Sequence, residues 1–165
     1  MKRFALLTLA AIGVIAAIAG TAFARGGGWE PLPAPPHDAA CGGTIVHVTA
    51  PVDKEYFRTA TLTDGTVRID VTGSLKLQFS TDAGASTSAN ASGPGSEFLY
   101  PNGDVEFVTT GLASFPLTAS QAATLGVPQL QVSAGPTDVI LHPDGSVSGH
   151  MGNIIRDICA ELGAS

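Results

Sequence analysis

Cys41 and Cys159 are the only cysteines of the chain, and their thiols offer its most specific covalent chemistry. In an exported chain, two cysteines predict a disulfide. A metal site and a nucleophilic thiol are the alternatives, but the sequence has no C-x-x-C motif and no His-rich segment beside either cysteine. We therefore predict a Cys41–Cys159 disulfide that joins the start of the folded domain to its end.

The four histidines, His37, His47, His142 and His150, are the candidate metal ligands. Zinc would suit three histidines with a carboxylate. The sequence contains no H-E-x-x-H motif, and the histidines are not closely spaced. We therefore predict no metal site and no cofactor.

Carboxylates flank two turn sequences: Glu97, Asp104 and Glu106 surround one, and Asp64 and Asp70 surround the other. Paired carboxylates perform acid–base catalysis when burial separates their pKa values. These side chains fall at turn positions or on the predicted solvent face, and aspartate is common in turns. No G-x-S-x-G motif is present, so we predict no catalytic residue.

The N-terminal segment has the three parts of an export signal. Lys2 and Arg3 precede an uncharged, Ala-rich stretch that closes on Ala22-Phe23-Ala24. This order predicts a signal peptide over 1–24, cleaved between Ala24 and Arg25, and hence a secreted protein. The alternative is an uncleaved membrane anchor.

The net charge of the mature chain limits the classes of partner that it can bind. The formal net charge is −6 at pH 7, and loss of Lys2 and Arg3 makes it more negative. Such a charge repels nucleic acid and anionic lipid. We predict no nucleic-acid partner and no membrane association after cleavage.

The mature chain divides into a linker and one domain. Residues 25–40 are rich in Gly and Pro and predict an extended tether, with Trp29 docking on its own domain. Residues 41–165 have the length of one domain with one core.

Much of 41–165 alternates apolar and polar residues, which is typical of half-buried strands. Asn102-Gly103 predicts a two-residue turn that sets Phe98 against Phe107 and puts Glu106 on the solvent face. Asp64-Gly65 predicts a similar turn with Leu62 opposite Val67.

Two further turns are predicted with three-residue loops. The first covers 143–145 and sets Leu141 against Val147. The second covers 72–74 and sets Ile69 against Leu77.

These turns predict an all-β antiparallel meander, a barrel or sandwich of about 8–10 strands. One short C-terminal helix is expected, capped by Asn153 and stopped by Gly163. The expected strands are 44–49, 56–63, 66–71, 75–80, 86–92, 96–101, 104–110, 128–133, 137–142 and 146–150.

The layout resembles the small secreted proteins of unknown function that are common in actinomycetes. The resemblance covers about 41–162 and implies an exported, β-barrel-like domain without an assigned activity. The shared motifs are Cys41, Gly65-Thr66, Ser92-Gly93-Pro94-Gly95, Pro101-Asn102-Gly103-Asp104, Pro143-Asp144-Gly145-Ser146 and the segment Asp157–Leu162.

The function that these observations favour is a non-enzymatic domain that binds a small apolar ligand or a partner at the mouth of a barrel. One alternative is a barrel-type cyclase or isomerase that uses Tyr or carboxylate groups. The other is a cell-surface structural protein.

Overall fold

The computed structural model describes residues 28–164. The predicted signal peptide 1–24 and its cleavage point between Ala24 and Arg25 lie outside the described residues. The strands are β1 (Glu30–Pro31), β2 (His37–Cys41), β3 (Thr44–Thr61), β4 (Val67–Ser80), β5 (Ser86–Asn90), β6 (Gly95–Leu99), β7 (Val105–Thr109), β8 (Leu112–Pro116), β9 (Leu130–Ala134), β10 (Thr137–Leu141), β11 (Val147–His150) and β12 (Asn153–Asp157). The helices are α2 (Ala119–Leu125) and α3 (Ile158–Glu161).

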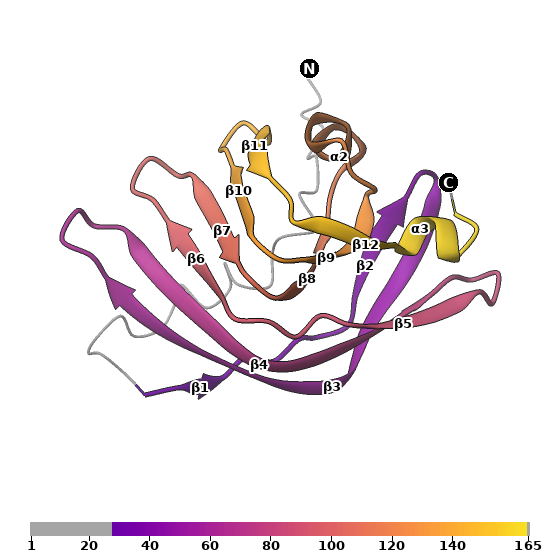
Figure 1. The fold of residues 1–165 in the computed structure, drawn as a ribbon, viewed down its shortest axis with the longest axis horizontal. Helices are drawn as coiled ribbons and strands as arrows, with labels where there is room; N and C mark the ends of the chain where they lie inside the picture. The colour runs from indigo at the N-terminus through magenta and orange to yellow at the C-terminus, as the bar shows by residue number, and fades with distance from the viewer. Residues whose placement is uncertain (1–27, 165) are drawn as a thin grey trace, which may run out of the picture.

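The long hairpin of β3 and β4 is the frame of the molecule. It curves beneath the other elements in Figure 1. At one end β2 pairs with β3 and β5 pairs with β4. At the other end β1 pairs with β3, while β6, β7, β10 and β11 follow β4 in order. All of these pairings are antiparallel, as predicted.

A second sheet, in the order β12-β9-β8, lies on the concave side of this hairpin (Figure 1). The strand path of the first sheet runs from β1 to β11 without returning to its start. The antiparallel β class is therefore confirmed, but residues 28–164 form no closed barrel.

The predicted loop over 72–74 is wrong, because β4 runs through it. Gly73 lies within the strand, opposite Glu55. Its φ is +138°, and a Cβ there would lie 2.2 Å from the Lys54 carbonyl oxygen. The glycine permits a backbone conformation that other residues rarely adopt, so it continues the strand here instead of turning it.

The other three predicted hairpins are present, but two of them have a different register. The 143–145 loop sets Leu141 against Val147, as predicted. At Asn102-Gly103, however, Leu99 pairs with Val105, which moves the register by one residue. The cause is a three-residue loop over 101–103, with Gly103 at φ +91°. This is the loop type of 143–145, with the glycine in the left-handed position.

The Asp64-Gly65 hairpin shows the same shift. Thr61 pairs with Val67, whereas the two-residue turn sets Leu62 there. The side chain of Asp64 accepts a hydrogen bond from the backbone N–H of Thr66 at 2.9 Å. Such a bond stabilises the turn locally, while the extra loop residue decides which face each strand residue occupies.

Both chain ends of the domain differ from expectation. Two parts of the predicted 25–40 tether belong to the sheet, because residues 30–31 form β1 and residues 37–40 begin β2. The C-terminal helix is capped by Asp157 rather than Asn153, and residues 153–157 form β12 instead.

Helix α2 was not predicted, although Thr118 and Gln121 form a capping box at its start.

The main core lies between the β2–β5 end of the first sheet and β9 with α3. Its fully buried centre contains Val46, Phe79, Leu130 and Ile158. At the other end of the first sheet, Phe107 of β7 contacts Phe115 of β8 edge to face, with ring centroids 5.8 Å apart. The second sheet therefore packs against both ends of the first.

Candidate functional site

An apolar hollow lies on the concave side of β3 and β4. Its volume is about 250 Å³. Its lining combines a proline-rich segment, the two long strands and the second sheet: Leu32, Pro33, Ala34, Pro35, His37, Val48, Glu55, Leu75, Leu77, Phe79, Ser114, Pro116 and Leu130. We call it the apolar pocket.

One wall of the apolar pocket is the segment Leu32–Pro35, which we call the strap. Two hydrogen bonds hold it against the sheet. The Leu32 N–H donates to the Glu55 carbonyl oxygen at 2.9 Å, and the Ala34 N–H donates to the Asp53 carboxylate at 2.7 Å. Just before the strap, Arg58 lies 4.8 Å from the Trp29 ring centroid, a cation–π distance. Trp29 thus docks on its own domain, as predicted.

Glu55 is the carboxyl group of the pocket wall. Alternation places it on the same face of β3 as Phe57 and as Asp53. Burial raises the pKa of Glu55 to about 7, and the negative charge of Asp53 contributes to the rise. Among residues 28–164, no hydrogen-bond donor reaches its side chain. In the sequence, the two-residue spacing between Glu55 and Phe57 is the signal that places both side chains on the same face of a strand. This signal was not used in the prediction.

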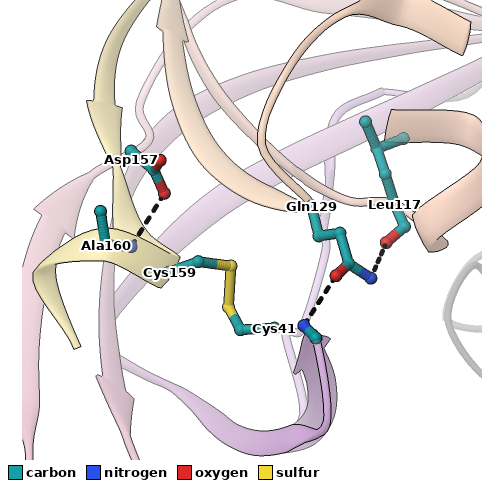
Figure 2. The surroundings of a disulfide bond; sticks show 7 residues. Cys41, Leu117, Gln129, Asp157, Cys159 and Ala160 are labelled. Carbon is teal, nitrogen blue, oxygen red and sulfur yellow. Dashed lines mark hydrogen bonds between the residues drawn. A yellow bond between two sulfur atoms is a disulfide. The ribbon is translucent and has the colours of Figure 1, made fainter. Parts of the chain in front are cut away.

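The predicted disulfide is present between Cys41 and Cys159, whose Cα atoms are 5.3 Å apart. Figure 2 shows the bond joining the end of β2 to α3. Beside it, the Gln129 side chain accepts from the Gly42 N–H at 2.7 Å. Asp157 caps α3 by accepting from the Ala160 N–H at 3.0 Å. The bond ties the ends of the domain together and lies outside the apolar pocket.

The histidines are placed separately. The His47 ring forms hydrogen bonds with Asp38 at 2.8 Å and with Asp82 at 3.0 Å. Both bonds raise the pKa of His47, and the bond to Asp82 has the larger effect. His142 bonds to Asp104 at 2.9 Å rather than approaching His150. Residues 28–164 contain no group of three His, Cys, Asp or Glu side chains arranged to hold a metal ion.

Glu97 is the carboxylate that the sequence placed wrongly. The one-residue shift at the 101–103 loop pairs it with Phe107 and turns it inward. It is 5% exposed, and its Oε2 atom has no hydrogen-bond partner within the part of the chain that the structure describes. Burial raises its pKa to about 7.

Asp70, in contrast, is paired on the convex face. Its carboxylate accepts from Arg68 at 2.7 Å, from Ser96 at 2.7 Å and from Arg58 at 3.1 Å. The Arg68 guanidinium holds the pKa of this carboxyl well below its usual range. With Trp29, these side chains border a shallow second hollow of about 380 Å³. The Asp70 carboxylate is therefore fully engaged, and the group of one carboxylate and two guanidiniums carries a net positive charge.

Comparison with known proteins adds no relative: no protein-family model, no curated protein and no solved structure matches this chain. The resemblance to secreted actinomycete proteins therefore stays a prediction.

Proposed function

We propose that this chain is an exported, non-enzymatic binding domain that holds a small apolar ligand in the apolar pocket. The observation that carries the proposal is a hollow of about 250 Å³ walled by Val48, Leu77, Phe79 and Leu130 beneath the strap. Ligand sites are concave and mostly apolar, with few polar groups, and are usually 300–1,000 Å³ for drug-sized ligands. A pocket slightly below that range suits a smaller molecule.

Binding is favoured over catalysis by the polar groups of the lining. His37 bonds through Nδ1 to the Pro35 carbonyl oxygen at 3.2 Å, and it makes no hydrogen bond to Glu55 or Ser114 within the described residues. Acid–base catalysis requires groups that reach a common reacting atom. An isolated carboxyl in an apolar wall is better suited to orienting a bound ligand than to catalysing its conversion.

Export is supported by the Cys41–Cys159 bond, because disulfides persist in oxidising compartments. The predicted 1–24 signal and secretion remain part of the proposal. Within 28–164, no helix has the length and apolar character needed to cross a bilayer. We also propose to class the fold as a two-sheet sandwich, since the main core lies between the sheets.

The test is a titration with benzyl alcohol, a compact neutral probe, followed by amide NMR shifts. We expect saturable shifts at Val48, Leu77 and Phe79. Ala34→Phe should weaken binding by about tenfold or more, because its ring would occupy the pocket while the Ala34 N–H still reaches Asp53. Ala60→Phe, on the exposed part of β3, is the matched control and should leave binding unchanged.

Absence of saturable shifts at these three residues would reject the proposal. Equal binding by the Ala34→Phe variant would place the ligand elsewhere and reject it too. Thermal unfolding of both variants checks that each still folds.

A further inference from the structure

The apolar pocket has a charge at one end only. Three residues lie side by side at this end of the pocket: Leu32 of the strap, Glu55 of β3 and Gly73 of β4. Directly opposed strand residues have Cβ atoms about 5 Å apart, so the side chain at 73 would normally cover Glu55. Since that residue is glycine, β4 leaves the Glu55 side chain uncovered on this side.

Asp53 reinforces the negative charge at this end. One of its carboxylate oxygens accepts from the Ala34 N–H of the strap and the other lies 3.4 Å from the Glu55 backbone N–H. Asp53 is thus engaged in holding the strap, whereas the Glu55 side chain has no partner among residues 28–164. Two carboxylates lie together, and neither has a Lys or Arg partner within the described residues.

The remaining walls carry no fixed charge. Strand β4 contributes Leu75, Leu77 and Phe79, and the second sheet contributes Ser114, Pro116 and Leu130. From β2, His37 is the one other titratable lining group, and its Nδ1 is bonded to Pro35. A ligand therefore meets an apolar cavity with a single negative, unpaired end.

We propose that the ligand is a small apolar monocation, a compact hydrocarbon body bearing a primary ammonium group. This inference rests on the proposed function and names its ligand class. The ammonium would bond to Glu55, and the body would lie among Val48, Leu77 and Phe79. A neutral ligand would leave the ionised carboxylate desolvated and unpaired, which is costly. A charge-assisted bond from an ammonium removes that cost.

The test compares three probes of nearly equal size at pH 8: benzylamine, benzyl alcohol and benzoate. We expect benzylamine to bind about tenfold tighter than benzyl alcohol, because a charge-assisted bond adds on the order of one such factor. Benzoate should not bind detectably. Lowering the pH from 8 to 6 protonates Glu55, so it should weaken benzylamine binding and should not weaken benzyl alcohol binding.

Glu55→Gln should reduce the affinity for benzylamine to that of benzyl alcohol or below, without weakening the binding of the alcohol. Glu30→Gln makes the same change in charge on neighbouring β1, outside the lining, and should change neither affinity. His37→Gln should preserve the preference for the amine, which separates the Glu55 contribution from that of His37.

Equal affinities for amine and alcohol would overturn the cation assignment and leave the proposed function intact. An amine preference that survives Glu55→Gln, or tighter binding of benzoate, would overturn it as well. Binding of none of the three probes would overturn the proposed function and this inference together.

Discussion

At the residue scale, two glutamates with raised pKa values distinguish this domain from a plain β scaffold. Both owe the rise mainly to burial, which disfavours the charged carboxylate. Glu55 lines the apolar pocket, where a ligand can supply its partner. Glu97 is enclosed between Ile69 and Phe107 on neighbouring strands, so its ionisation affects stability rather than binding.

The raised pKa of Glu97 predicts that its contribution to the free energy of unfolding falls as the pH rises. Its folded-state pKa of about 7 lies above the ordinary 4.5, so the folded state binds the proton more tightly. The contribution of Glu97 to the free energy of unfolding should be largest below about pH 4.5 and should decrease as the pH rises through 7. The full difference is roughly 3 kcal/mol, and Glu55 contributes with the same sign.

Glu97→Gln removes the ionisable group at nearly constant volume. At pH 8 the variant should be more stable than the parent, and near pH 4.5 the difference should largely vanish. Urea unfolding at a series of pH values measures this, with the exposed Glu30→Gln as the control. A variant whose stability changes with pH as steeply as the parent's would contradict the assignment.

At the element scale, the uninterrupted β3–β4 hairpin makes the pocket possible. It carries strands on both sides at each end and presents Glu55, Leu75 and Leu77 to the concave side. Strand β4 can run through position 73 without a break only because that residue is glycine. Its φ of +138° and the close Lys54 carbonyl exclude a side chain there.

Gly73→Ala should therefore destabilise the domain by about 2–4 kcal/mol, combining a strained φ with a contact that the backbone must relieve. Gly84→Ala is the matched control, because Gly84 has φ +87° but open space around it. It should lose only about 1 kcal/mol. Denaturant unfolding compares the two, and equal losses would show that the Lys54 contact is unimportant.

At the scale of the whole molecule, the Cys41–Cys159 bond spans a sequence separation of 118. It joins β2 at one edge of the first sheet to α3 beside the second sheet, so it holds the two sheets together around the main core. The chain-entropy model predicts roughly 5 kcal/mol for a loop of this length, and measured values are typically about 2–4 kcal/mol.

Cys41→Ala and Cys159→Ala should each cost about 2–4 kcal/mol in the free energy of unfolding. The double variant should lose little more than either single variant, because one bond is lost in all three. Thiol labelling of the unfolded, unreduced parent should find no free cysteine. Additive losses in the double variant would show two independent core residues instead.

The sequence by itself determined the strand class, the positions of three hairpin turns and the cysteine pair. These follow from local alternation, from Gly at left-handed loop positions, and from the fact that the chain has only two cysteines. Sequence reasoning also had the information for α2, since Thr118 and Gln121 are a capping box, but the helix was overlooked among the strand signals.

Tertiary structure decided the register and the site. Asn102-Gly103 is compatible with a two- or a three-residue loop, and local chemistry does not choose between them. The choice depends on packing of both strands, and a shift of one residue moves every side chain to the other face. That is why Glu97 is buried. The apolar pocket is likewise non-local, because Leu32, Glu55 and Ser114 come together only when the strap and the second sheet close over the β3–β4 hairpin.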